Sequence, residues 1–186
     1  MVADVRHTRA MELPTLRDGD LVLRPKRVED IDAITAACQD PEIPRWTLVP
    51  SPYTRADAEA FLARSAEEEA AGVSANLLAV NARDGTLLGS FSVMGLDREP
   101  GYGEIGYWVA AEGRGRGVAT RAVRLVSEWA VRELGLTRVE ILAHQDNAPS
   151  RRVAEKAGFR DTGELAPLPR GDHDEAVYAV YVLGAF

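Results

Sequence analysis

The most informative part of the chain reads Arg114-Gly115-Arg116-Gly117-Val118-Ala119-Thr120. It follows a strand-like run over residues 104–110 and opens a helix-like run over residues 118–134. Glycines let the backbone adopt unusual dihedral angles and approach a ligand closely. The free N–H groups at a helix start, together with the helix dipole, favour an anion there, and arginines add charge-assisted donors. The stretch therefore predicts a loop that holds a phosphate group, with a plain loop and helix cap as the alternative.

Two common phosphate-binding motifs do not fit this loop. A dinucleotide fingerprint requires G-x-G-x-x-G, but the third glycine position falls on Val118 when counted from Gly113 and on Thr120 when counted from Gly115. An NTPase loop requires Gly-Lys-Ser/Thr, and both lysines of the chain lie elsewhere. A different phosphate ligand is therefore indicated.

The loop also contains the pattern R-x-x-G-x-A, formed by Arg114, Gly117 and Ala119. This pattern resembles the acetyl-CoA pyrophosphate loop of the GNAT superfamily of N-acetyltransferases. A second segment, residues 147–159, reads N-x-x-S-x-x-V-x-E-K-x-G-F and is similar to the ribosomal-protein (RimJ/RimL-like) branch of that superfamily. The resemblance extends over residues 16–183.

The resemblance implies transfer of an acetyl group from acetyl-CoA to a primary amine, either a protein N-terminus or a small molecule. It implies that the backbone N–H of Val109 stabilises the oxyanion and pairs with the pantetheine arm. Asn147 would contact pantetheine or substrate, although a helix-capping role is equally open. The implied cosubstrate-binding residues are Val109, Arg114, Gly115, Arg116, Gly117, Val118, Ala119, Thr120 and Asn147.

Glu104 is the candidate general base. A protonated amine cannot attack a thioester, and amines are largely protonated at neutral pH, so a base is required. Glu104 lies on the strand that leads into the loop, among the aromatic and apolar neighbours Tyr102, Ile105 and Tyr107. Burial there would raise its pKa. The alternative is a half-exposed strand carboxylate without a catalytic role.

Ser150 is the candidate at the leaving group. Many GNAT enzymes place a tyrosine near this point, and the RimJ/RimL-like branch has a serine. Because a thiolate with a pKa of about 8.5 is already an acceptable leaving group, a hydrogen bond from Ser150 would suffice. The alternative is that Ser150 only helps to cap a helix that begins near Asn147.

Two loops are candidates for the acceptor side. The resemblance places Trp46 and Tyr53 where relatives shape the acceptor pocket, although such aromatic residues also fill cores. The acidic loop over residues 169–175 would suit a cationic acceptor, or it is a solvated hairpin tip.

Composition limits the function further. The net charge of −7 argues against a nucleic-acid binder. No apolar run approaches the ~20 residues needed to span a membrane, and the first residues do not form a secretory signal. Cys38 is the only cysteine and is expected to be buried. The histidines show no metal-ligand spacing, so we expect no metal. A cytoplasmic protein fits these features.

The chain predicts a single domain over residues 16–186 behind a flexible tail over residues 1–15. Strands are expected at residues 21–24, 75–81, 86–94, 102–110, 138–143, 159–165 and 176–183. Helices are expected at residues 28–39, from a Thr54–Asp57 capping box onward, at 118–134 ended by Gly135 and at 149–157 ended by Gly158, with a proline-rich loop over residues 40–53. The alternation of strands and helices fits a layered α/β fold. The resemblance implies a mixed, mostly antiparallel central sheet of about seven strands flanked by helices, with the fourth and fifth strands splayed.

Two competing functions remain open from the sequence. One is an acyl-CoA-binding module without turnover. The other is a nicotinamide dinucleotide enzyme, for which Glu140 lies at a suitable distance beyond the loop although the glycine spacing fails. A homodimer formed through an exposed sheet edge or helix face is compatible with either.

Overall fold

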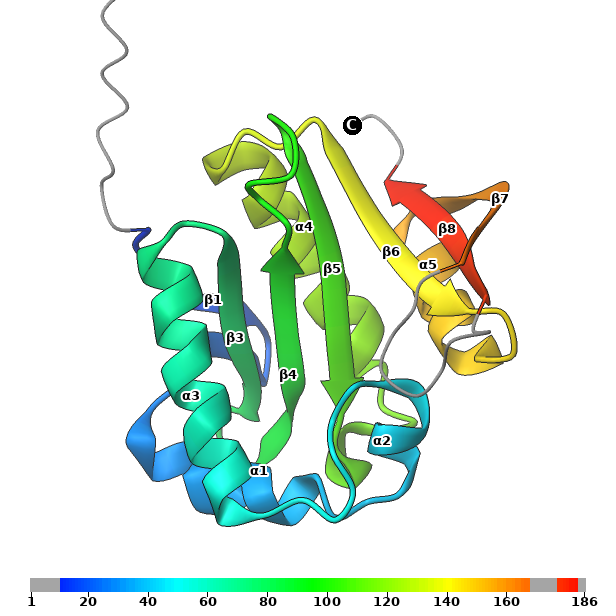
Figure 1. Cartoon of the computed structure of the whole chain (residues 1–186). Helices are drawn as coiled ribbons and strands as arrows, with labels where there is room; N and C mark the ends of the chain where they lie inside the picture. Colours follow the sequence, from blue (N-terminus) through cyan, green and yellow to red (C-terminus); the bar gives the residue numbers. More distant parts are fainter. Residues whose placement is uncertain (1–10, 168–176, 184–186) are drawn as a thin grey trace, which may run out of the picture.

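The computed structural model describes residues 11–167 and 177–183. An eight-stranded sheet forms the centre of the molecule (Figure 1). Its strands are β1 (Leu16–Asp18), β2 (Leu21–Pro25), β3 (Ser74–Asn81), β4 (Leu87–Met94), β5 (Tyr102–Val109), β6 (Arg138–His144), β7 (Phe159–Pro167) and β8 (Val177–Leu183). The expected sheet is confirmed with one strand more than predicted, the three-residue β1.

The strands lie in the order β1-β2-β3-β4-β5-β6-β8-β7. Every neighbouring pair is antiparallel except β5 and β6, which run parallel. A parallel pair needs a long crossover connection, usually a helix. The helix that follows the glycine loop, Val118–Glu133, forms this crossover. The two parallel strands, the loop and this helix therefore form one β-α-β unit.

Helices cover both faces of the sheet. They are α1 (Ile31–Ala37), α2 (Glu42–Trp46), α3 (Arg55–Ala70), α4 (Val118–Glu133) and α5 (Ala148–Ala157), with two short 3-10 turns at Val28–Asp30 and Ala111–Gly113. One hydrophobic cluster joins the sheet to α4 and α5, and the other joins it to α1 and α3. Figure 1 shows α3 and α4 on opposite sides of the central strands.

Sequence signals at the helix ends explain most of these boundaries. Thr54 and Asp57 form the predicted capping box at the start of α3, where Asp57 Oδ2 accepts from the Thr54 N–H at 2.8 Å. Gly135 follows α4 with φ +69° and ends it, as predicted. Gly158 ends α5 with φ +99°.

Two expectations needed correction. The helix predicted over residues 28–39 is a 3-10 turn followed by the shorter α1, and the loop predicted over residues 40–53 contains α2. The predicted tail over residues 1–15 stays a prediction, because the structure describes it only from Met11 onward, where Met11 and Leu13 pack against the core cluster. The acidic loop over residues 169–175 lies outside the described residues.

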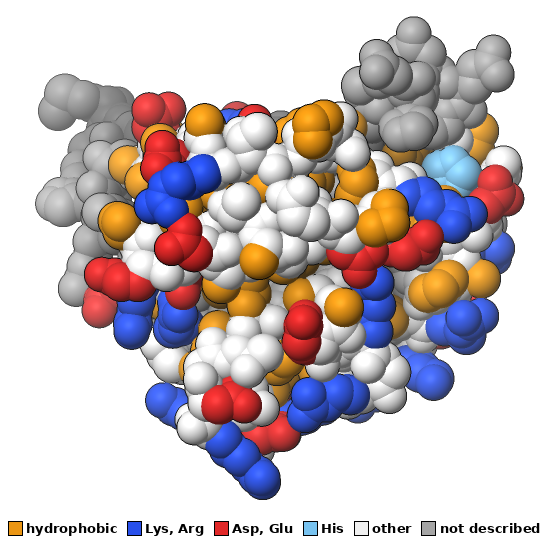
Figure 2. All heavy atoms as spheres, turned by 90° about the horizontal axis from the view of Figure 1, so that it is seen from below, with side chains coloured by type: hydrophobic (Ala, Val, Ile, Leu, Met, Phe, Trp, Pro, Cys, Tyr) orange, Lys and Arg blue, Asp and Glu red, His pale blue; other side chains and the backbone are white. Residues whose placement is uncertain are grey.

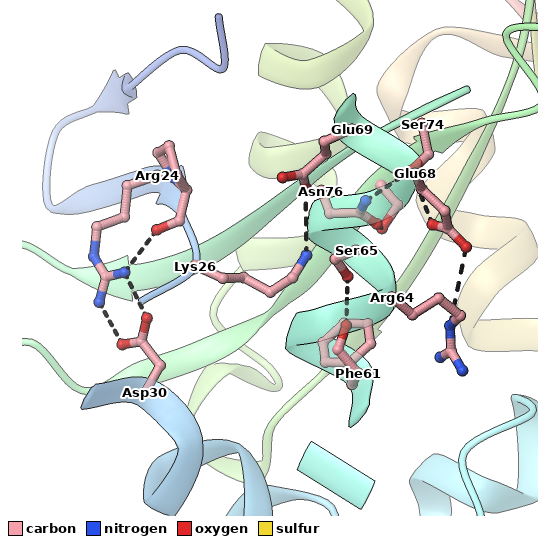
Figure 3. A network of polar contacts seen from close by, with 12 residues as sticks. Arg24, Lys26, Asp30, Phe61, Arg64, Ser65, Glu68, Glu69, Ser74 and Asn76 are labelled. Atoms are coloured by element: carbon pink, nitrogen blue, oxygen red, sulfur yellow. Dashed lines mark hydrogen bonds and ion pairs between the residues drawn. The ribbon is translucent and has the colours of Figure 1, made fainter. Parts of the chain in front are cut away.

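Arg24 attaches α1 to the sheet. Its guanidinium forms a two-pronged ion pair with Asp30, with Nη1–Oδ2 and Nη2–Oδ1 distances of 2.8 and 2.6 Å (Figure 3). Asp30 also accepts from the Arg27 N–H at 2.7 Å. The end of β2 and the turn before α1 therefore hold each other in place.

Lys26 occupies an unusual position between β2 and α3. Its side chain is 6% exposed, and Nζ lies 3.9 Å from Glu69 Oε1 and 4.7 Å from the centre of the Phe61 ring (Figure 3). Within the described part of the chain, Lys26 Nζ and Glu69 Oε1 are the buried side-chain atoms without a hydrogen-bond partner. Burial lowers the pKa of Lys26 to about 8.

We expect this lysine to make stability rise with pH. Between pH 8 and 10.5 the unfolded chain binds the proton that folded Lys26 has lost, so the free energy of unfolding increases across that window. The gain is roughly 3 kcal/mol, at about 1.4 kcal/mol per pKa unit. Urea unfolding of the wild type and of Lys26→Met, repeated from pH 7 to 11, measures it. Two parallel pH curves would show that the pKa of Lys26 is not lowered.

Candidate functional site

The site begins where β5 and β6 part. Their pairing covers only Tyr102–Glu104 of β5 against Arg138–Glu140 of β6. Beyond Glu104, β5 stays paired with β4, and β6 stays paired with β8. The two strands therefore diverge toward their C-terminal ends, as Figure 1 shows. The expected splay of the fourth and fifth predicted strands is confirmed.

A cavity of about 920 Å³ crosses this gap. It brings together residues that are distant in sequence, from the loop after β5, the start of α5 and the segment around α2. Its wall contains all but one of the predicted site residues: Trp46, Tyr53, Glu104, Val109, Arg114, Gly115, Gly117, Val118, Ala119, Thr120, Asn147 and Ser150. The exception is Arg116, which is exposed and donates to the Glu112 carbonyl oxygen at 3.2 Å.

The loop before α4 has the backbone shape that its glycines suggest. Gly115 and Gly117 have φ of +68° and +72°, which non-glycine residues rarely adopt. Gly113 has a different role, because a Cβ there would lie 2.6 Å from the Leu88 carbonyl oxygen. Tight packing thus explains Gly113, and backbone conformation explains the other two.

The start of α4 offers backbone donors to the cavity. Gly117 is the N-cap residue, and the helical ladder begins with the Arg121 N–H donating to the Gly117 carbonyl oxygen. Residues 118–120, whose amides precede that ladder, line the cavity. Arg114 donates to Asp40 at 2.6 Å, which ties the loop to the segment before α2.

Val109 turns its amide toward the gap between β5 and β6. The N–H of the next residue, Ala110, donates to the Leu88 carbonyl oxygen on the β4 side at 3.0 Å. Because successive amides along a strand point to opposite edges, the Val109 N–H points to the β6 side. A backbone donor therefore faces the cavity where the resemblance expects one.

Glu104 is buried, with 2% of its surface exposed, and it lines the cavity. Its Oε2 lies 3.2 Å from Arg98 Nη1. The burial matches the expectation from its neighbours, whereas the arginine partner was not anticipated. Glu140, next to it on β6, is bound by Arg138 and by the Tyr102 hydroxyl.

Ser150 has a partner that the sequence did not reveal. Its Oγ lies 2.9 Å from the hydroxyl oxygen of Tyr107 on β5. Asn147 accepts from the Ser150 N–H at 3.1 Å and so caps α5. Burial raises the pKa of Tyr107 to about 12, which keeps its hydroxyl protonated at neutral pH. The pattern of alternating residues on β5 was the only signal that could have pointed to Tyr107.

The end of the cavity beside α2 is aromatic. Trp46 ends α2, and its ring centre lies 5.5 Å from that of His144, which in turn lies 5.6 Å from that of Tyr178. Tyr53 is buried against α1 and α3, and burial raises its pKa to about 12. His144, at the end of β6, is a lining residue that sequence reasoning did not select.

The face seen from below carries basic and acidic side chains interspersed with hydrophobic ones (Figure 2). Cys38 is buried, as expected, and burial raises the pKa of its thiol to about 12. Within residues 11–167 and 177–183, no helix is long and apolar enough to span a bilayer, and no group of acidic, cysteine or histidine side chains is arranged to hold a metal.

Comparison with known proteins gives a consistent result. Residues 20–160 match the family described as Acetyltransferase (GNAT) domain. YdaF of Bacillus subtilis, whose name marks it as a candidate ribosomal N-acetyltransferase, is 39% identical over 109 residues. That match covers 58% of this chain and 57% of YdaF, so the chain spans little more than half the length of this relative.

Two solved structures have the same fold. RimJ of Mycobacterium smegmatis, in complex with CoA-disulfide, has a TM-score of 0.79 at 20% identity, covering 95% of this chain and 88% of RimJ. The ribosomal-protein-S5-alanine acetyltransferase of Vibrio fischeri has a TM-score of 0.79 at 18% identity, covering 91% of this chain and 95% of that one. At these identities the likeness establishes the fold. The match to the family model over residues 20–160 shows that the chain belongs to the GNAT acetyltransferase family.

Proposed function

We propose that this protein transfers the acetyl group of acetyl-CoA to the α-amino group of a protein N-terminus, by direct attack of the amine. One observation carries the proposal. A single cavity joins the N-terminus of α4 to Glu104 and Ser150 across the gap between β5 and β6. The names of YdaF and of the Vibrio fischeri enzyme favour a ribosomal-protein acceptor over a small amine.

The loop and the start of α4 would bind the pyrophosphate of acetyl-CoA. The amides of residues 118–120 act with the helix dipole on the anion. Gly115 and Gly117 give the loop the backbone shape that this requires. Arg114 would reach a phosphate by leaving Asp40, whereas Arg116 adds only long-range charge because it lies outside the cavity wall.

Glu104 and Val109 would act at the reacting carbon. Glu104 takes a proton from the amine, directly or through water, so that the nitrogen lone pair becomes available. The Val109 N–H, turned toward the gap, donates to the oxygen that becomes negative during attack. Both groups line the same cavity, with β5 as their common support.

Ser150 would assist the departing sulfur. With Tyr107 donating its proton to Ser150 Oγ, the serine proton is free to hydrogen-bond the thiolate. The high pKa of Tyr107 keeps this donor intact across the neutral range. Ser150 thus takes the place of the tyrosine that many GNAT enzymes have near the leaving group, and the buried Tyr107 orients it.

Binding of the cosubstrate is expected to depend on Gly117. Gly117→Glu places a carboxylate at the positive end of α4 and should weaken acetyl-CoA and CoA binding by tenfold or more. Gly135→Glu is the matched control, because Gly135 follows the other end of α4 with a similar φ of +69° and open space around it. Calorimetric titration of both variants with acetyl-CoA, CoA and NAD tests this. Equal affinities in the two variants, or binding of NAD alone, would exclude the proposed loop function.

The leaving-group pair is expected to behave as one unit. Ser150→Ala and Tyr107→Phe should each lower kcat by about tenfold, the size of one hydrogen bond to a charged group. The double variant should lose little more than either single one, because the two groups act in series. Steady-state kinetics with peptides that begin with serine or alanine measure this. If the loss of kcat in the double variant equalled the product of the two single losses, the two hydroxyls would act independently.

Glu104→Gln is expected to lower kcat/KM by about a hundredfold, the scale of general-base catalysis. The remaining activity should rise more steeply with pH, because only amine that is already neutral reacts. Acetyl-CoA affinity should stay as in the wild type. A pH–rate profile identical to that of the wild type would exclude Glu104 as the base. Acetyl-CoA binding without acetylation of any amine would instead favour the acyl-CoA-binding module.

A further inference from the structure

A chain of polar side chains runs through the sheet on the face that α3 covers. Ser74 and Asn76 on β3 are 3% and 4% exposed. Asn76 lies opposite Ser92 of β4, and Ser92 lies opposite Gly106 of β5. Apolar side chains at such buried positions would stabilise the fold more than polar ones do. The polar side chains therefore suggest a role other than stability.

This row of hydrogen-bonded side chains is continuous from the cavity to α3. Ser92 Oγ donates to Asn76 Oδ1 at 2.7 Å, and Asn76 Nδ2 donates to Ser74 Oγ at 2.8 Å. Ser74 Oγ then donates to Glu68 Oε2 at 3.0 Å. Figure 3 shows the part of this chain formed by Asn76, Ser74 and Glu68. The other Glu68 oxygen, Oε1, is ion-paired with Arg64 at 3.9 Å.

Glu68 fixes the direction of every bond in the chain. A carboxylate only accepts hydrogen bonds, so the Ser74 hydroxyl must donate its single hydrogen bond to Glu68. Ser74 can then only accept from Asn76, which requires the Asn76 nitrogen on that side and its oxygen toward Ser92. The Ser92 hydroxyl must therefore donate its hydrogen bond to Asn76 Oδ1. At the cavity, the Ser92 oxygen is left as an acceptor.

Ser92 and Glu104 both line the cavity. Ser92 lies opposite Gly106 and Met94 lies opposite Glu104, and the flexible Met94 side chain packs over Gly106. Two hydrogen-bond acceptors therefore lie on neighbouring strands of the same cavity wall, and a group that carries several N–H donors complements them.

We propose that Ser92 binds the acceptor amine by accepting one of its N–H bonds, and that Glu68 acts from outside the cavity as a positioning residue. The inference rests on the proposed function and adds to it a specificity for N–H donors. A neutral primary amine has two N–H bonds and one lone pair. After Glu104 has taken one proton from the ammonium form, Ser92 and the unprotonated oxygen of Glu104 accept the two N–H bonds that remain, and the lone pair is left for the thioester carbon.

The direction of the chain matters for this role. A serine with a free proton would donate it to the amine lone pair and so block the attack. Because Glu68 draws the protons of the chain away from the cavity, Ser92 cannot do this. Glu68→Gln removes that constraint, since an amide can donate to Ser74 as well as accept from it.

The test measures peptide binding to the CoA-loaded protein, so it does not depend on turnover. The two probes are one peptide with a free α-amino group and the same peptide with a trimethylated N-terminus, which keeps the charge but has no N–H. We expect the wild type to prefer the free amine and Ser92→Ala to lose about tenfold of that preference. Ser92→Thr, which retains the hydroxyl, should restore it. Glu68→Gln should lose about threefold, although Glu68 lies outside the cavity wall.

Ser65→Ala is the matched control. Ser65 is a buried serine on α3 whose Oγ donates to the Phe61 carbonyl oxygen at 2.8 Å, so its loss should leave the preference unchanged (Figure 3). Equal preferences in the wild type, Ser92→Ala and Ser65→Ala would overturn the inference, as would a wild type that binds both peptides equally or neither. A preference that follows Ser92 in a protein that acetylates no amine would refute the proposed function alone.

Discussion

The parting of β5 and β6 is the constraint on which the rest of the site depends. A sheet normally pairs every strand edge, because unpaired N–H and C=O groups are costly when buried. Here β5 keeps its partner on one edge and gives up the other after Glu104, so Val109 turns its amide into a cavity. The open edge is tolerated because polar groups of a ligand can take the place of the missing strand. The crossover begins at the same place with the glycine loop, so Glu104, Ser150 and the start of α4 line one cavity.

Much of this arrangement could be predicted from local sequence. The loop around Gly115 and Gly117 predicted its own backbone shape, and the Thr54–Asp57 capping box and Gly158 predicted helix ends. These features depend on a few neighbouring residues and on steric rules that hold in any fold. The separation of β5 and β6 was instead predicted from the family resemblance, because no local sequence pattern indicates which strands do not pair.

The parts that could not be predicted depend on contacts between distant residues. Tyr107 and Ser150 are 43 positions apart, and their hydrogen bond exists only because α5 begins beside the open edge of β5. Arg98 reaches Glu104 from the turn between β4 and β5, which a strand pattern does not reveal. The short α2 was missed because Pro44 and the proline-rich flanks indicated a loop, whereas tertiary packing of Ile43 stabilises the helix.

The polar groups in the sheet show how function and stability oppose each other in this fold. Ser74, Asn76 and Glu104 occupy buried strand positions where aliphatic side chains would contribute more to the free energy of folding. Their burial is tolerable only while each one keeps a partner, because an unpaired buried polar group costs more than its hydrogen bond contributes. A continuous chain from Ser92 to Glu68 meets that requirement for the neutral members, and Arg98 meets it for Glu104. The network is therefore not a set of independent polar residues. Changing any one member alters the hydrogen bonding of the next, so the network links Glu68 on α3 to Ser92 in the cavity wall.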